Sequence, residues 1–94
     1  MIRSFADRET ALIWQGRQSR RLPSEIQAVA LRKLRMLNQA RKLLDLRVPP
    51  ANRLEALKGA RKGQYSIRIN QQWRVCFAWH EGEPRNVEIV DYHD

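Results

Sequence analysis

Two arginines in the C-terminal third of the chain have the spacing of a phosphate-binding pair. Arg68 and Arg74 lie in two runs of alternating apolar and polar residues that the short segment 70–72 separates. If the runs form an antiparallel hairpin, directly opposed residues point to the same face of the sheet. A three-residue loop at 70–72 pairs Ile67 with Val75 and places Arg68 opposite Arg74 on the other face.

Like charges that face each other across two strands are destabilising, so this pair suggests an anion bound between the guanidinium groups. Two guanidinium forks that converge from rigid strands can hold a phosphate through bidentate hydrogen bonds. The alternative is a solvated face on which both side chains extend separately into water. The pairing alone does not decide between a phosphate site and a solvated face.

The C-terminal segment supplies groups that can transfer protons. Asp91, Tyr92 and His93 place a carboxylate, a phenol and an imidazole within three consecutive residues. Histidine gains and loses protons near neutral pH, and an acid or a phenol can support it. Strand alternation places Asp91 and His93 on one side and Tyr92 on the other. The alternative is a polar chain end without a catalytic role.

A basic loop precedes the predicted hairpin. Lys58, Arg61 and Lys62 alternate with the glycines at positions 59 and 63. Clustered cations attract a nucleic-acid backbone regardless of its sequence. The segment lacks the spacing of a nucleotide-binding phosphate loop, and a solvated turn is the alternative.

The single cysteine, Cys76, cannot form an internal disulfide bond, which favours a reducing, cytoplasmic location. We expect Cys76 to pack as a small apolar residue rather than act as a nucleophile. Cys76, His80 and His93 do not have metal-ligand spacing, so neither a metal nor another cofactor is expected. No run approaches the roughly 18 apolar residues of a membrane span, and the N-terminus has no signal segment, so no membrane partner is expected.

The first half of the chain predicts two helices. One spans residues 7–15, with Asp7 as its N-cap and Gly16 ending it. The other spans residues 24–46, with Ser24 and Gln27 as a capping box and Pro49-Pro50 beyond its end. Its apolar residues recur at three- and four-residue steps, namely Ile26, Val29, Ala30, Leu34, Leu37 and Leu44.

The remaining segments predict strands. Residues 2–5 are expected to form a short one, and residues 65–69, 73–79 and 87–92 an antiparallel sheet with a turn at 81–84. Trp73 and Trp79 share parity with the apolar residues, so they should face the core. The 94 residues fit one domain of the α+β class, with helices on one face of the sheet.

The charge distribution favours a polyanionic partner. The chain has 18 basic residues, of which 14 are arginine, against 10 acidic residues, and its net charge is +8. Residues 1–80 hold 17 of the bases and five of the acids, whereas residues 81–94 hold one base and five acids. Arginine is better suited than lysine to bidentate phosphate contacts. The acidic segment either lies near a bound anion or neutralises its own neighbours.

Taken together, these segments resemble HigB-type toxins of the RelE superfamily. The resemblance is carried by residues 53–59 (RLEALKG), 61–79 (RKGQYSIRINQQWRVCFAW) and 87–93 (VEIVDYH). It covers essentially the whole chain, residues 1–94, as a single toxin domain. It implies a RelE-like α+β fold with N-terminal helices packed on one face of an antiparallel sheet.

The resemblance also implies a function. Such toxins belong to type II toxin–antitoxin systems and are neutralised by HigA-like helix-turn-helix antitoxins, through which they reach operator DNA. They enter the ribosomal A site and inhibit translation as messenger-RNA endonucleases (mRNA interferases). The ribose 2′-hydroxyl attacks the phosphate and leaves a 2′,3′-cyclic phosphate and a 5′-hydroxyl.

By position, Arg68 and Arg74 match basic residues that hold the scissile phosphate, and Asp91, Tyr92 and His93 match the catalytic cluster. Lys58, Arg61 and Lys62 are then candidates for binding RNA or the ribosome. Two departures are Glu55, where a relative has histidine, and Ala60, which replaces an acid common in the matching loop. The alternatives are a toxin that poisons the ribosome or gyrase without cutting RNA, and a protein that acts mainly as a co-repressor with its antitoxin. The gyrase-poisoning branch lacks the C-terminal cluster, which speaks against the gyrase version.

Overall fold

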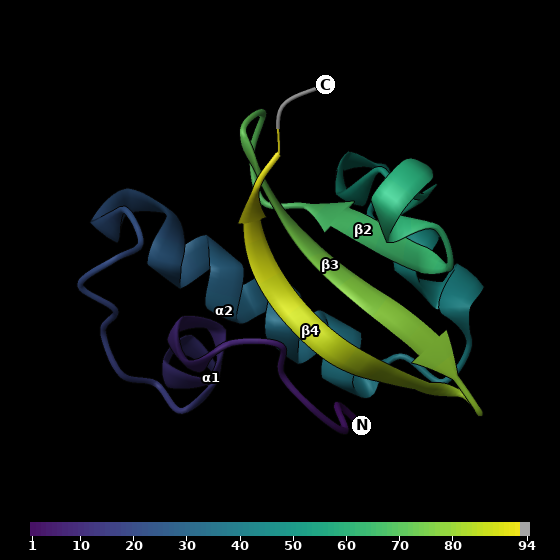
Figure 1. Cartoon of the computed structure of the whole chain (residues 1–94), viewed down its shortest axis with the longest axis horizontal. Coiled ribbons are helices and arrows are strands. Elements are labelled where there is room, and N and C mark those ends of the chain that lie inside the picture. Colours follow the sequence, from purple (N-terminus) through teal and green to yellow (C-terminus); the bar gives the residue numbers. More distant parts are fainter. Residues whose placement is uncertain (93–94) are drawn as a thin grey trace.

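Two helices, α1 (Arg8–Trp14) and α2 (Ser24–Gln39), lie against one face of a four-stranded antiparallel sheet (Figure 1). The computed structural model describes residues 1–92. Its strands are β1 (Glu55–Ala56), β2 (Gln64–Arg68), β3 (Trp73–His80) and β4 (Glu83–Asp91), and they lie in that order across the sheet. Two short 3₁₀ helices, η1 (Leu43–Arg47) and η2 (Pro50–Asn52), connect α2 to β1, and a third, η3 (Gly59–Arg61), lies between β1 and β2. The predicted α+β class is confirmed.

Helix α1 begins as predicted, because the Asp7 carboxylate accepts hydrogen bonds from the backbone N–H and the hydroxyl of Thr10. The buried Thr10 hydroxyl in turn accepts a hydrogen bond of 2.9 Å from the Ile89 N–H, which ties α1 to β4. The predicted strand at residues 2–5 is wrong: within this segment only Phe5 forms a bridge, parallel to Val87.

Helix α2 begins at Ser24, after Pro23, without a side-chain cap, so the predicted capping box is wrong. The Gln27 side chain instead donates hydrogen bonds to the carbonyls of Ser19 and Leu22, at 2.8 and 2.9 Å. Gln27 thereby fixes the loop that precedes the helix rather than the helix end.

Helix α2 ends at Gln39 and not at Leu46. The Asp45 carboxylate accepts hydrogen bonds of 3.0 Å from the backbone N–H groups of Arg41 and Lys42, and this turn starts η1. These backbone hydrogen bonds lower the pKa of the Asp45 carboxyl. Leu44, expected on the apolar face of the helix, is 59% exposed as a result.

The register of the β2–β3 hairpin is the predicted one. Arg68 pairs with Arg74, and Ile67 pairs with Val75 in the core that faces α2. Trp73 and Trp79 pack against this core, as expected from their parity. The next turn is shorter than predicted, since His80 already pairs with Glu83. Strand β4 therefore begins at residue 83 rather than 87.

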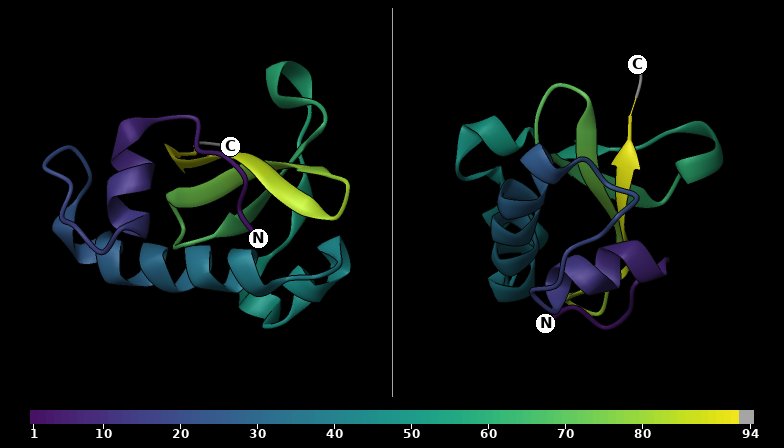
Figure 2. Two further views of the ribbon diagram at one scale, coloured as in Figure 1. Left: turned by 90° about the horizontal axis from the view of Figure 1, so that it is seen from below. Right: turned by 90° about the vertical axis from the view of Figure 1, so that its left-hand side faces the viewer.

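The other face of the sheet is partly covered by the chain between α2 and β2. Strand β1 has two residues and pairs Glu55 with Ser66. Residues 57–63 stand out from the sheet on the side opposite α2 (Figure 2). No helix within residues 1–92 has both the length and the apolar character of a membrane span. The face away from α2 is where the predicted site residues lie.

Candidate active site

Cross-strand pairs on this face bring together residues from four strands. Arg68 on β2 and Arg74 on β3 form one pair. The adjacent row runs from Glu55 through Ser66 and Cys76 to Glu88. Basic and acidic side chains therefore lie in neighbouring rows of the same sheet face.

Arg74 is the centre of the site and is only 3% exposed. Its Nη1 donates hydrogen bonds to Glu55 Oε1 at 3.1 Å and to the Ser66 hydroxyl at 3.0 Å. Its guanidinium carbon lies 4.7 Å from the centre of the Tyr92 ring, within the range of a cation–π contact. The structure thus brings Arg74 and Tyr92 together, and a solvated Arg74 is ruled out.

Glu55 supplies negative charge next to the arginine pair, where the sequence suggested a bound anion. Its carboxylate offsets the repulsion between Arg68 and Arg74, since it pairs with Arg74. The Glu55 side chain is 49% exposed, so a ligand can reach it. From the sequence, Glu55 was a departure from a relative that has histidine at this position, able to accept a proton but not to stabilise a phosphate, and no pattern placed it against Arg74.

Arg68 retains capacity to bind an anion. Its side chain is half-buried, and its buried Nε has no hydrogen-bond partner among residues 1–92. Arg74, by contrast, is almost fully buried and already pairs with Glu55, whereas no salt bridge within residues 1–92 involves Arg68. Arg68 is therefore the arginine of the pair that is better placed to accept a new anionic partner.

The Asp91 side chain lies on the sheet face opposite to the one that carries Arg74. It pairs with Trp73, and its carboxylate accepts a hydrogen bond of 3.1 Å from the side chain of Gln72. The predicted separation of Asp91 from Tyr92 by strand alternation is confirmed. His93 falls outside the described residues.

The basic loop divides into two kinds of residue. Arg61 donates hydrogen bonds to Glu88 at 3.2 Å and to Gln64 at 3.0 Å. Lys58 and Lys62 are exposed. Arg61 thus holds the loop onto the sheet, while the two lysines face solvent.

One further cation lies beside the site. Arg53 lies two residues before β1, at the end of η2, and lines a cavity together with Arg68. Arg53 is exposed and has a left-handed backbone conformation, with φ 46°. A two-residue strand has no alternation long enough to reveal its register in the sequence, so Arg53 was not predicted.

Cys76 has no exposed surface, and burial raises the pKa of its thiol. The expectation of a packed rather than a nucleophilic cysteine is consistent with both observations. Within residues 1–92, no cluster of three or more histidine, cysteine or acidic residues could hold a metal ion.

Cys76 is accordingly expected to resist alkylation in the folded protein. Only the thiolate reacts with the reagent. The raised pKa keeps the fraction of thiolate low, and burial keeps the reagent away from the sulfur. Iodoacetamide at pH 8 should modify the chain only after guanidinium chloride unfolds it, as followed by mass spectrometry. Rapid modification of the folded chain would contradict this placement.

Comparison with known proteins places the chain in a family. Residues 3–93 match the model of the RelE-like toxin of type II toxin–antitoxin system HigB. Toxin HigB-1 of Vibrio cholerae serotype O1 is 44% identical over 90 residues, which cover 95% of each chain. Endoribonuclease HigB of Proteus vulgaris is 26% identical over 93 residues, covering 99% of this chain and 100% of the relative.

The fold is shared more widely than the sequence. A chain of the YoeB–YefM complex from Staphylococcus aureus superposes with a TM-score of 0.61 at 14% identity, covering 100% of this chain and 99% of that one. The match with the family model over residues 3–93 and the 44% identity together settle the family. The chain belongs to the HigB-like toxins, the RelE-like toxins of type II toxin–antitoxin systems.

Proposed function

We propose that the chain is a ribosome-dependent endoribonuclease that cleaves messenger RNA in the A site, with a HigA-like antitoxin as its inhibitor. The observation that carries the proposal is the contact of Arg74 with both Glu55 and Tyr92, next to Arg68. These four side chains supply the cations, the carboxylate and the phenol that cleavage of a phosphodiester requires. The name of the relative from Proteus vulgaris, an endoribonuclease, supports the same activity.

The reaction begins with attack of the ribose 2′-oxygen on the neighbouring phosphorus. A bond forms between the 2′-oxygen and phosphorus, and the bond from phosphorus to the 5′-oxygen breaks. The 2′-hydroxyl loses a proton and the departing 5′-oxygen gains one, while negative charge grows on the phosphoryl oxygens. The site must therefore provide a proton acceptor, a proton donor and fixed positive charge.

Glu55 is our candidate for the proton acceptor. Its carboxylate is half-exposed and is oriented by Arg74, whereas Asp91 lies on the other side of β4. Arg68 contacts the phosphate through the exposed part of its guanidinium group, and Arg74 adds charge behind Glu55. Tyr92 or His93 returns the proton to the 5′-oxygen.

Exposed cations around the site would hold the RNA and the ribosome. Lys58 and Lys62 extend this positive surface on the 57–63 segment, and Arg61 anchors the segment through Glu88. Contacts of this kind with phosphates are independent of base sequence and weaken as salt rises. They suit recognition of ribosomal RNA and of the messenger backbone.

A translating extract tests the proposal directly. Added toxin should produce new messenger 5′ ends at codons in the A site and 2′,3′-cyclic phosphates upstream of them. Naked messenger should remain almost intact, and a HigA-like antitoxin should suppress the cuts. Stalled ribosomes on intact messengers would instead identify a non-nucleolytic poison, and an inert toxin with normal antitoxin-dependent operator binding would identify a co-repressor.

A further inference from the structure

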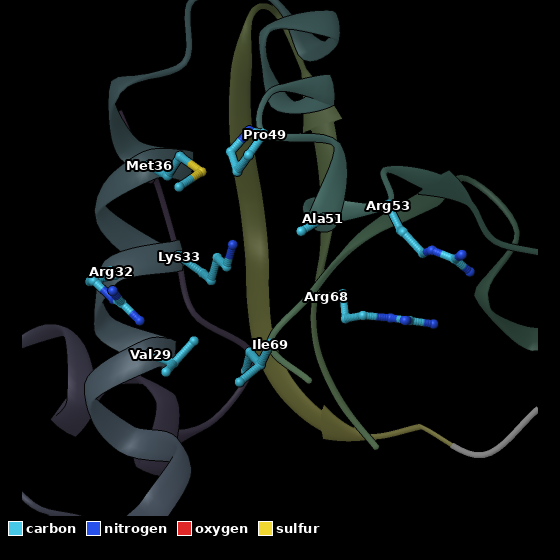
Figure 3. Close-up of a pocket in the computed structure, with 9 residues that line it drawn as sticks. All are labelled: Val29, Arg32, Lys33, Met36, Pro49, Ala51, Arg53, Arg68 and Ile69. Carbon is cyan, nitrogen blue, oxygen red and sulfur yellow. The ribbon is translucent and has the colours of Figure 1, made fainter. Parts of the chain in front are cut away.

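A cavity of about 570 Å³ opens beside Arg68, between α2, η2 and the end of β2 (Figure 3). Its walls carry four cationic side chains, Arg32 and Lys33 from α2 together with Arg53 and Arg68. None of the residues that the structure places around the cavity is acidic. The cavity is therefore a concave site of positive charge that continues the arginine pair of the active site.

The positive charge of the cavity is not neutralised by the protein. None of the four cations forms a salt bridge with a carboxylate of residues 1–92. Lys33 donates a hydrogen bond of 2.6 Å to the neutral side chain of the buried Asn52. Burial, with a further contribution from the charge of Arg32, lowers the pKa of Lys33. A bound anion would relieve this accumulation of charge.

The two arginines stand together at the mouth of the cavity. Figure 3 shows Arg53 and Arg68 extending side by side, with their guanidinium groups pointing away from α2. Arg68 in turn pairs with Arg74 across β2 and β3. The Arg68 guanidinium, with its several N–H donors, can therefore bridge two successive phosphates, namely the scissile one beside Arg74 and the next one, which Arg53 also contacts.

The inner wall of the cavity is apolar. Met36, Pro49 and Ile69 line it, and Lys33 extends from the helix side. An inorganic anion would gain nothing from these apolar side chains, whereas the flat ring of a base packs well on them. The volume also lies in the usual range of about 300–1,000 Å³ for small-molecule sites. A cationic mouth and an apolar interior together fit a nucleotide.

We propose that this cavity binds one nucleotide of the RNA strand next to the scissile bond, with its phosphate on Arg53 and Arg68 and its base against Met36, Pro49 and Ile69. Lys33 is placed to donate a hydrogen bond to the base. This inference rests on the proposed function, since it assumes that RNA enters the adjacent active site. A carboxylate from a protein partner would also pair with the arginines, but it would leave the apolar wall without a matching group.

The test uses 2′-O-methyl RNA, which binds but cannot be cleaved because the attacking hydroxyl is blocked. Fluorescence titration at low salt compares a dinucleotide with a tetranucleotide on the full chain, on Arg53→Gln and on Lys33→Gln. Arg35→Gln is the matched control, because Arg35 is exposed on α2 and does not line the cavity. Uridine monophosphate and inorganic phosphate are added as competitors.

The tetranucleotide should bind more tightly than the dinucleotide to the unmodified chain. Arg53→Gln should weaken the tetranucleotide about tenfold and leave the dinucleotide nearly unchanged, because one charge-assisted contact is lost. The slope of log affinity against log salt should fall by about 0.7 for the lost phosphate contact. Lys33→Gln should show the same length dependence, with thermal melting used to confirm that the variant is folded.

Several outcomes would overturn the assignment. The first is that the unmodified chain binds the dinucleotide and the tetranucleotide with equal affinity. The second is that Arg53→Gln weakens the binding of both by the same factor. The third is that Arg35→Gln weakens tetranucleotide binding as much as Arg53→Gln does. Displacement of the tetranucleotide by micromolar uridine monophosphate or phosphate would assign the cavity to a free metabolite or ion. The assay needs neither ribosomes nor cleavage, so a failure of the proposed function would appear separately, as intact messengers in the translating extract.

Discussion

The Arg74→Ala variant is expected to cleave ribosome-bound messenger about a thousandfold more slowly than the unmodified chain. Loss of a single preorganised donor to a transition-state oxyanion typically costs about 10²–10³ in rate. Arg74 contributes more than one interaction, because it also holds Glu55 and Tyr92 in the site. Single-turnover cleavage with saturating ribosomes measures the effect, and relief of growth arrest reports it in cells.

Two further variants separate this role from a structural one. Arg74→Lys keeps the charge but loses the planar fork, so it should recover only part of the rate. Arg85 is also half-buried, but it pairs with Ala78, four residues beyond Arg74 on β3. The Arg85→Ala variant should therefore cleave almost normally. Loss of the buried Arg74–Ser66 hydrogen bond should cost about 1–3 kcal/mol of stability, measurable by denaturant unfolding. Arg74→Ala should still bind the antitoxin, and full toxicity of this variant would contradict the site.

The sequence alone predicted the hairpin correctly because strand parity is a strong constraint. A shift of one residue would move Ile67 and Val75 from the core to the opposite face. A loop with an odd number of residues keeps both runs in phase, and the three residues 70–72 satisfy this condition. Arg68 and Arg74 had to be paired as a consequence, without any direct signal from the arginines themselves.

The same logic fails where elements are short. Strand β1 has only two residues, so the sequence had no alternation from which to place Glu55 against Arg74. The pairing comes from the path of the chain through η1 and η2, which depends on tertiary contacts. One of them is the buried Asn52, whose side chain donates to the Leu46 carbonyl at 3.1 Å.

The end of α2 shows a local interaction overriding a periodic pattern. Leu44 continues the three- and four-residue spacing of the apolar residues, and this spacing predicted a helix that reaches residue 46. The Asp45 carboxylate instead binds the backbone N–H groups of Arg41 and Lys42. Aspartate competes well for backbone donors in this way, which favours turns and caps over helix interiors. The resulting path places Pro49 and Arg53 around the cavity beside the site.

Glu55→Gln is expected to lower the rate of cleavage at least a hundredfold, which is the smaller end of the range for loss of a general base. The amide oxygen can still accept the hydrogen bond from Arg74, so the geometry of the site should persist. Only the negative charge and the capacity to take a proton are removed. Binding of the messenger should not weaken, and it should strengthen if the carboxylate competes with phosphate for Arg74. The expected signature is therefore a large fall in kcat with an unchanged or lower KM, measured on programmed ribosomes.

The pH dependence of the same variants distinguishes a base from a residue that only orients Arg74. A base must be deprotonated to act, so the rate of the unmodified chain should rise with pH and then level off. Glu55→Gln should lack this rise, and Glu55→His should restore part of the activity with the rise moved towards neutral pH, since imidazole titrates higher than a carboxyl group. Asp91→Asn serves as the matched carboxylate control and should keep the pH profile of the unmodified chain, because Asp91 faces away from Arg74. If Asp91→Asn abolished cleavage while Glu55→Gln remained active, the proton acceptor would be Asp91, and β4 would have to turn its end towards the phosphate when RNA binds.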